Sequence, residues 1–210
     1  KIEKEISLLE WNIEEAEKKG YPHFMLKEIM EQGDAIRNVL RGRMIIEEGA
    51  VKFGGLENIE QKLRNIERLT IIGMGTAYLA GFVGKYMLEE YAQMPVMLEN
   101  ASEFRYKKSI IDKNSAVIAV SQSGETADTL FAVKEAKRQG ALTLGIINVV
   151  GSSIAREVDA GIYNHAGIEI GVASTKAFVS QVAVFALLSV YLGRQRGMSP
   201  IMGKRIIEEL

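Results

Sequence analysis

The chain has 210 residues, and 47% of them are hydrophobic, which is enough to bury the core of a globular domain and excludes a disordered chain. The 26 basic and 27 acidic residues give a net charge of −1 without a long block of either sign, so we expect neither nucleic acid nor an acidic surface as a partner. Cysteine is absent and the only histidines are His23 and His165, so we expect no disulfide, no metal site and a cytoplasmic location, and we assign neither histidine a role.

Residues 1–67 are expected to form a helical lead-in. Helical periodicity runs through "ISLLEWNIEEAEKK", "HFMLKEIMEQGDAIRNVLRGRMI" and "LENIEQKLRNIE". The stretches between them contain Gly20-Tyr21-Pro22 and Gly54-Gly55, which are typical helix breaks. This part of the chain is therefore predicted to precede the main domain rather than to belong to its sheet.

Residues 68–195 alternate between short apolar runs and helical stretches. Strands are predicted over 69–73, 95–100, 115–120, 142–148 and 160–165, and helices over 76–92, 102–108, 125–139, 153–157 and 175–193. Such alternation, with strands that are apolar on both faces, indicates an α/β fold of three layers (αβα) with a parallel sheet covered by helices on both sides. Five strands suit the flavodoxin-like order 2-1-3-4-5, in which ligands bind beyond the carboxyl ends of strands 1 and 3. Residues 196–210, ending in "KRIIEEL", are expected to begin a further helix that continues past Leu210.

The longest apolar stretch, Ala177 to Leu192, is predicted to be a buried helix. It contains Ser180, Gln181 and Ser189 and is short for a membrane span, so no membrane contact is expected. The helix would be apolar nearly all round, and we expect that one small domain does not cover all of that surface. We therefore also expect the chain to associate through exposed apolar surface.

The turn "SQSGET" at 121–126 follows the third predicted strand and suits a phosphate. A phosphate at a helix N-terminus is held by free backbone N–H groups and the helix dipole, and hydroxyl or amide side chains add donors. Gly124 lets the backbone approach such a ligand closely, and the donors would come from Ser121, Gln122, Ser123 and Thr126. The alternative is that Ser123 is an ordinary N-cap, and the residues alone leave both interpretations open. Glu125 would repel a phosphate, so we expect it to face away.

The turn "GMGTA" after the first predicted strand has two interpretations. Gly73 and Gly75 follow a strand and open a helix, as in a dinucleotide-binding fingerprint. Tyr78 occupies the position where that fingerprint needs a small residue, whereas Glu99 at the end of the second strand keeps a nicotinamide site as a minor alternative. The predicted topology places this turn beside the "SQSGET" turn, and we expect no cofactor.

A third polar segment, "AGIEIGVASTKAF" at 166–178, opens the long apolar helix. Ser174 or Thr175 would be its N-cap. Lys176 in the first turn is unfavourable for the helix dipole, which suggests a reason for it outside the helix.

Taken together, these motifs resemble the sugar isomerase (SIS) family. Within that family the chain is similar, almost from end to end, to the first half of the isomerase domain of glutamine–fructose-6-phosphate aminotransferases. The "SQSGET" turn alone indicates only an SIS domain, whereas "ASEFRYKKS", "NVVGSSIARE" and "EIGVASTKAF" are more specific. The lead-in "EAEKKGYPHFMLKEIMEQ" resembles the segment that joins the glutaminase and isomerase domains of those enzymes.

The resemblance implies binding of fructose 6-phosphate and a part in its conversion, with ammonia from glutamine, to glucosamine 6-phosphate. Carried over by position, the phosphate would be held by Ser121, Gln122, Ser123 and Thr126, with the cradle completed by Gly75 and Thr76, and the sugar would be contacted by Val172 and Ser174. The family usually has a serine where this chain has Ala77. That change removes a hydroxyl, which is expected to weaken phosphate binding unless a neighbour or water compensates.

The resemblance also implies what lies outside this chain. The general base, the histidine associated with ring opening and the lysine that forms a Schiff base would belong to the second SIS half and the tail beyond residue 210, and we do not expect Lys176 to be that lysine. The glutaminase domain and the second SIS half would be partners within the parent protein, and a homodimer is expected. The alternative is a stand-alone SIS module that binds a phosphosugar and regulates without catalysis.

Overall fold

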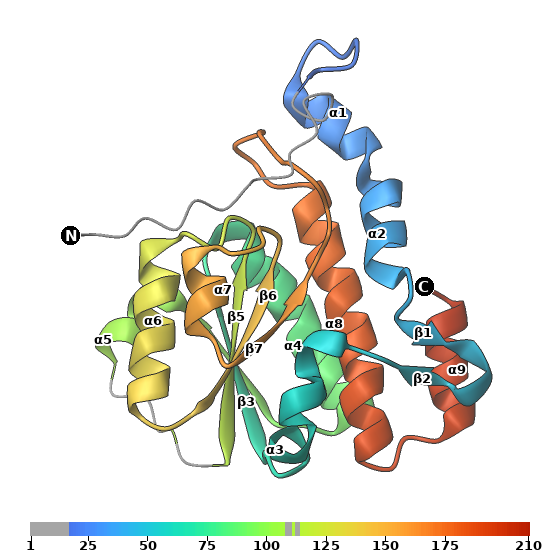
Figure 1. Cartoon of the computed structure of the whole chain (residues 1–210), viewed down its shortest axis with the longest axis vertical. Helices are drawn as coiled ribbons and strands as arrows, with labels where there is room; N and C mark the ends of the chain where they lie inside the picture. The colour runs from blue at the N-terminus through green and yellow to red at the C-terminus, as the bar shows by residue number, and fades with distance from the viewer. Residues whose placement is uncertain (1–16, 108–110, 112–113) are drawn as a thin grey trace.

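The structure is a computed structural model that describes residues 17–107, 111 and 114–210. The predicted helix in "ISLLEWNIEEAEKK" falls almost entirely outside these residues. Among the described residues the chain forms one parallel sheet with helices on both faces, a small antiparallel ribbon and a set of helices flanking the sheet domain (Figure 1).

The five predicted strands form a single parallel sheet. In chain order its strands are β3 (Arg68–Gly73), β4 (Val96–Asn100), β5 (Ser115–Ser121), β6 (Leu142–Ile147) and β7 (Ala160–Tyr163). The spatial order β4-β3-β5-β6-β7 confirms the predicted 2-1-3-4-5 topology. Ile72 of β3 pairs with Ala119 of β5, so these two strands end at neighbouring points of the same edge.

Helices cover both faces of this sheet, as the apolar strands require. One face carries α4 (Gly75–Ala92) and α8 (Lys176–Gln195), and the other carries α5 (Ala101–Tyr106), α6 (Ala127–Arg138) and α7 (Ser153–Glu157) (Figure 1). Successive strand residues alternate between two core clusters. Ile71 belongs to the cluster beneath α8 and Ile72 to the one beneath α6, and both are fully buried. The three-layer αβα architecture is thus confirmed.

The lead-in is only partly helical. The helices α1 (Phe24–Met30) and α2 (Gln32–Leu40) are followed by an antiparallel ribbon of β1 (Met44–Ile45) and β2 (Ala50–Val51), and the segment closes with the 3-10 helix η3 (Gly54–Ile59) and α3 (Glu60–Arg64). The prediction of a helix through "RGRMI" is therefore wrong. Gly42 and Gly49 both adopt positive φ angles, 72° and 55°, which end α2 and turn the ribbon, whose tip is the 3-10 turn η2 (Ile46–Glu48).

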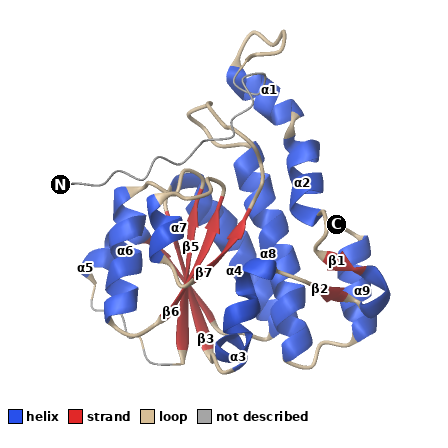
Figure 2. Cartoon of the chain, viewed as in Figure 1, coloured by secondary structure: helices blue, strands red, loops and turns tan. Residues whose placement is uncertain are grey.

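The long helix α8 is covered within this chain. It packs against α4 on one side and against α2, β2 and α9 (Pro200–Glu208) on the other, and Figure 2 shows α2 running beside it. It is long and apolar enough to cross a membrane, but 78% of its apolar window is buried inside the protein, so it is a core helix as predicted. The expectation that α8 would leave apolar surface for association is wrong, because the lead-in helices and α9 cover what the sheet domain leaves exposed.

Asp159 lies directly before β7, and its side chain bonds Thr143 of β6. These bonds allow the packing of the two strands to be tested by mutation. Its Oδ2 accepts hydrogen bonds from the backbone N–H of Thr143 (2.9 Å) and from the Thr143 hydroxyl (2.8 Å), and Lys137 Nζ lies 3.5 Å from Oδ1. Burial alone would raise the pKa of Asp159, but the bonds from Thr143 and the charge of Lys137 outweigh it, so the pKa lies below its usual value. The ionised carboxylate therefore stabilises the folded state above pH of about 4, and this contribution is lost as the pH falls further.

Asp159→Asn is expected to lower the free energy of unfolding at pH 7 by about 1–3 kcal/mol. Urea unfolding of both proteins at pH 7 and pH 3 measures the effect, and the difference between them should shrink at the lower pH. Asp34→Asn, which removes only an exposed pair with Arg37, is the control and should change stability by less than about 0.5 kcal/mol. An unchanged difference at pH 3 would contradict this role of the carboxylate.

Candidate functional site

The predicted turns meet at the carboxyl edge of the sheet. The pairing of Ile72 with Ala119 places the turn after β3 beside the turn after β5. The helices α4, α6 and α7 begin directly after β3, β5 and β6, so their N-termini lie at this edge, at the upper end of the sheet in Figure 2. Helix N-termini carry partial positive charge, so the edge is suited to an anion.

The "SQSGET" turn is a tight loop stabilised by its own serines. The hydroxyl of Ser121, a buried residue, accepts a hydrogen bond from the Gly124 N–H (2.9 Å), and that of Ser123 accepts one from the Glu125 N–H (3.2 Å). Gly124 has φ of 66°, and a Cβ there would lie 1.9 Å from Ser152 Oγ. Only glycine fits this position, and it brings the turn against the segment that begins α7.

The start of α6 has no side-chain cap. Its N-cap residue is Thr126, whose side chain makes no capping hydrogen bond, and the helix begins at Ala127, two residues later than predicted. The interpretation of Ser123 as the N-cap is therefore wrong, because its hydroxyl bonds within the loop instead. The N–H groups of the first helical turn precede the first intrahelical bond, from Leu130 N–H to the Thr126 carbonyl, and are suited to a bound anion.

Glu125 is directed toward the start of α7. Its Oε1 accepts a hydrogen bond from the Ser153 N–H at 2.7 Å. Hydrogen bonds from Ser153 and the positive charge of Arg156 lower the pKa of Glu125. This carboxylate stabilises the start of α7 rather than the "SQSGET" loop.

The turn after β3 leaves open space beside its glycine. Gly75 has φ of 55°, and no atom lies within 4 Å of the position that a Cβ would take. Thr76 is half-buried, and Ala77 is buried in the core with 8% of its surface exposed. Glu99, the acidic residue of the nicotinamide alternative, is bonded by Lys107 (3.0 Å), which weakens that alternative.

The segment before α8 is organised by Glu169, which the sequence analysis did not single out. Glu169 Oε1 accepts hydrogen bonds from the N–H groups of Thr175 (2.8 Å) and Ala177 (3.2 Å), and Oε2 accepts one from the Ser174 hydroxyl (2.7 Å). Thr175 occupies the N-cap position, but its own side chain makes no capping bond. The cap is thus a carboxylate from six residues upstream, which a search for serine or threonine caps does not detect.

Val172 and Lys176 of this segment differ in exposure. Val172 is fully exposed at its tip. Lys176 is buried with 4% of its surface exposed, and its Nζ donates to Glu31 Oε2 at 2.7 Å. Glu31 lies at the junction of α1 and α2, so the charge of Lys176 is paired with a residue outside its own helix.

Several buried polar atoms at or next to this edge have no hydrogen-bond partner among the described residues. They are Thr129 Oγ1 in the first turns of α6, Ser152 Oγ at the N-cap of α7 and both amide atoms of Asn164, directly after β7. The sequence analysis assigned them no role, although "GSS" before α7 has the same glycine and hydroxyl composition as "SQSG". Buried polar groups of this kind need a partner, and a polar ligand or water at this edge would supply one.

His23 lies directly before α1, and His165 lies two residues after β7. His23 is the N-cap of α1 and makes no side-chain capping bond. His165 has φ of 55°, and its carbonyl accepts from the Asn38 side chain. Burial, with a contribution from the charge of Arg43, lowers the pKa of His165, so its imidazole is neutral at pH 7. In the part of the chain that the structure describes, no group of three or more His, Cys, Asp or Glu residues could hold a metal ion.

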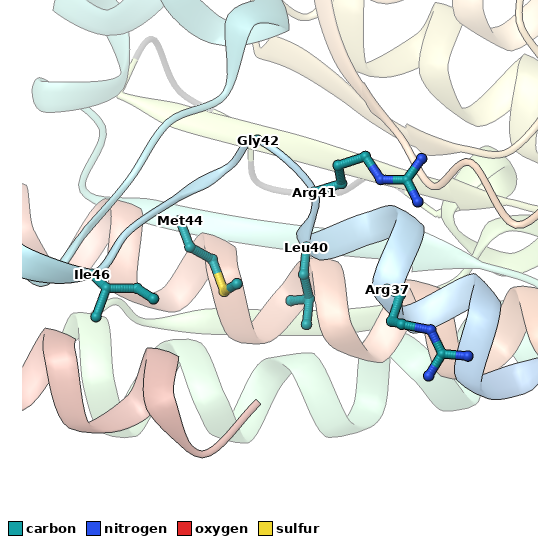
Figure 3. Close-up of a pocket in the computed structure, with 6 residues that line it drawn as sticks. All are labelled: Arg37, Leu40, Arg41, Gly42, Met44 and Ile46. Carbon is teal, nitrogen blue, oxygen red and sulfur yellow. The ribbon is translucent and has the colours of Figure 1, made fainter.

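Two hollows of about 410 Å³ lie elsewhere on the molecule. The first is shown in Figure 3, is formed by α2 and the segment that follows it, and is lined by Arg37, Leu40, Arg41, Gly42, Met44 and Ile46. Leu40 and Met44 point to one side there, whereas Arg41 points away from them. The second includes Asn114 and Gly140, at the amino edge of the sheet. Neither hollow contains a residue of the three predicted turns.

Comparisons with known proteins agree with these features. Residues 62–191 match the family model described as the SIS domain. The chain is 47% identical over 99% of its length to the glutamine–fructose-6-phosphate aminotransferase (isomerizing) of Chlorobaculum tepidum, and 45% identical over its whole length to that of Thermus thermophilus. It spans about a third, 34%, of the length of each relative.

A solved structure gives the same result. The C-terminal domain of glucosamine-fructose-6-phosphate aminotransferase from Francisella tularensis superimposes with a TM-score of 0.87 at 35% identity. This match covers 92% of the present chain and 54% of that chain. The similarity thus extends beyond the sheet domain into the lead-in.

Proposed function

Because the chain belongs to the SIS domain family, we propose that it binds a sugar phosphate at the carboxyl edge of its sheet, and that the ligand is fructose 6-phosphate or glucosamine 6-phosphate. The observation that carries this proposal is the adjacency of the 73–76 and 121–126 turns at uncapped helix starts. The names of the relatives supply the choice of sugar, since they are fructose-6-phosphate aminotransferases.

The hydroxyls of the "SQSGET" turn are available as donors. Ser121 and Ser123 use their oxygens to accept bonds from the loop, and each retains one O–H that can be donated to a phosphate oxygen. Thr126 makes no capping bond with its side chain, so its hydroxyl is a third donor in the proposed site, and Gln122 contributes an amide. Such bonds to a charged group are worth about 1.5–3 kcal/mol each.

The other site residues complete this assignment. Gly75 and Thr76 form the second wall of the phosphate site, where the absent Cβ of Gly75 leaves room. Val172 is exposed at the tip of the 169–177 segment, and its backbone would contact the sugar. Ser174 donates its hydroxyl hydrogen to Glu169, so toward the sugar it acts as an acceptor. Ala77 contributes no hydroxyl.

The parent protein that we propose is a glutamine-dependent fructose-6-phosphate transaminase of hexosamine biosynthesis. Its glutaminase domain and second SIS half would be partners of this chain and would carry the catalytic groups. We further propose a cytoplasmic homodimer and the division into 1–67, 68–195 and 196–210. The agreement of the relatives over the lead-in favours this parent over a stand-alone sensor.

The double variant Ser123→Ala/Thr126→Ala tests the site. Millimolar fructose 6-phosphate is expected to raise the Tm of the wild type, as any ligand of the native state does, and the variant should lose most of that rise because two donors to the phosphate are gone. Differential scanning fluorimetry and isothermal titration calorimetry measure the shift and the Kd, which should increase at least about tenfold.

Ser199→Ala is the matched control for this experiment. It removes a hydroxyl at another helix start, where Ser199 Oγ accepts from the Met202 N–H, and so it should lower the Tm without changing the ligand-induced rise. Equal rises in the wild type and the double variant would rule out the assigned residues.

A further inference from the structure

We propose that Glu28 of α1 is a positioning residue for the candidate sugar site, because it holds the 169–177 segment that presents Val172 and Ser174. The effect on sugar binding rests on the proposed function, but the contact of Glu28 with the 169–177 segment can be tested without a ligand. Glu28 lies 142 residues before Ile170 in the chain, so the contact joins the lead-in directly to the site.

The Glu28 carboxylate is buried and bound to the backbone of that segment. Only 2% of the residue surface is exposed. Oε1 accepts a hydrogen bond from the Ile170 N–H at 2.6 Å, and the Gly171 N–H lies 3.2 Å from Oε1 and 3.1 Å from Oε2. Burying a carboxylate is costly unless donors replace its water, and these two N–H groups, directly before Val172, are such donors.

Gly171 is shaped by the same contact. A Cβ at this position would lie 2.5 Å from Glu28 Oε2 and 3.5 Å from the Met25 Cα. The carboxylate therefore fills the space that any other residue would need. Because the oxygen is the end of a flexible side chain, an alanine at 171 would displace the carboxylate rather than distort the backbone of α1.

Two further carboxylates fix the other end of the segment. Glu169 accepts from the N–H groups of Thr175 and Ala177, and Glu31 pairs with Lys176 at 2.7 Å. Glu31 also lies 3.6 Å from Lys27 Nζ, so it belongs to a group of charges between the lead-in and the start of α8.

The consequence is a segment that is held on both sides of its tip. Glu28 binds Ile170 and Gly171, and Val172 lies, fully exposed, between them and the residues that Glu169 binds, which are Ser174, Thr175 and Ala177. A backbone contact to a sugar requires the peptide groups at the tip to be held in place. The position of α1 thus sets the position of the residues proposed to contact the sugar.

The test compares Glu28→Gln and Gly171→Ala with the wild-type chain. Glutamine at position 28 keeps the size of the side chain but loses the charge and one acceptor. Gly171→Ala leaves the charge of Glu28 unchanged, but the added methyl group pushes the carboxylate away from the Ile170 and Gly171 N–H groups. Both should accelerate hydrogen exchange of the 170 and 171 amides at least about tenfold, because a protecting hydrogen bond is weakened. Both should also raise the Kd for fructose 6-phosphate about tenfold.

Glu89→Gln is the matched control, since Glu89, like Glu28, accepts from a backbone N–H, that of Val96, but at the amino end of β4, where it also bonds Lys85. It should change neither readout. Normal exchange at 170 and 171 together with a normal Kd in both test variants would overturn the inference. If the wild type binds no fructose 6-phosphate, the proposed function fails, and the exchange rates alone decide whether Glu28 holds the segment.

Discussion

Gly124→Ala is expected to lower the free energy of unfolding by about 2–4 kcal/mol and to abolish the rise in Tm caused by fructose 6-phosphate. Two effects add. An alanine at φ of 66° is strained, and its Cβ would lie 1.9 Å from Ser152 Oγ and 2.6 Å from Ser152 Cβ. The loop would have to move away from α7, which displaces the proposed phosphate donors. Urea unfolding and calorimetric titration measure the two losses.

Gly140→Ala is a control that has the backbone strain of Gly124→Ala without its steric collision. Gly140 has φ of 88°, but no atom lies within 4 Å of its Cβ position, and it is at the opposite edge of the sheet. This control should cost only about 1–2 kcal/mol and leave the ligand response intact. Adding Ser152→Gly to Gly124→Ala removes the two nearest atoms and should restore part of the stability. A Gly124→Ala protein that retains both wild-type stability and ligand binding would contradict the assigned geometry.

Gly84→Ala is expected to destabilise the protein by about 2 kcal/mol through the contact of α4 with α8. A Cβ at 84 would lie 2.3–2.6 Å from ring carbons of Phe185, which is fully buried. The higher helix propensity of alanine would by itself stabilise the protein by about 1 kcal/mol, so the collision with Phe185 has to cost more than this gain. Thermal and urea unfolding measure the net effect.

Two further variants make this prediction specific. Gly33→Ala, inside α2, meets only the Arg37 guanidinium at 3.6 Å or more, and it should therefore leave stability unchanged or raise it by up to about 1 kcal/mol. Phe185→Leu combined with Gly84→Ala should cost less than the sum of the two single changes, because the smaller side chain makes room. Equal effects of the substitution at 33 and at 84 would show that the helices do not approach as closely as described.

The sheet was predictable because each strand is apolar on both faces and each is followed by a helix. All five strands and the topology followed from that alternation, and so did the adjacency of the 73–76 and 121–126 turns. The ribbon at 44–51 was not predictable in the same way, since "GRMIIEE" fits a helical period and only the backbone angles of Gly42 and Gly49 reveal the break. Hydrophobic periodicity therefore predicted the buried strands of the sheet correctly, but it did not predict the short ribbon at the surface.

The composition of the candidate site was predictable, but the hydrogen bonds within it were not. The hydroxyls of 121–126 and the unusual position of Lys176 could be read from the sequence. The capping of α8 by Glu169 and the anchoring of Gly171 by Glu28 could not, because both carboxylates act on backbone N–H groups that local sequence rules assign to other partners. Bonds of a side chain to the backbone of a distant segment depend on tertiary structure alone.

The packing of α2 against α8 shows which parts of the chain are needed to cover its core. The family model matches 62–191, yet one side of the central helix within that range is covered by residues from before 62 and after 191. The packed unit around α8 is therefore larger than the segment that the family model matches. If only the matched segment were transplanted into another protein, the apolar side of α8 would be exposed to water. The segment is therefore expected to fold in a new protein only with its flanking helices, or with other residues that cover α8 in their place.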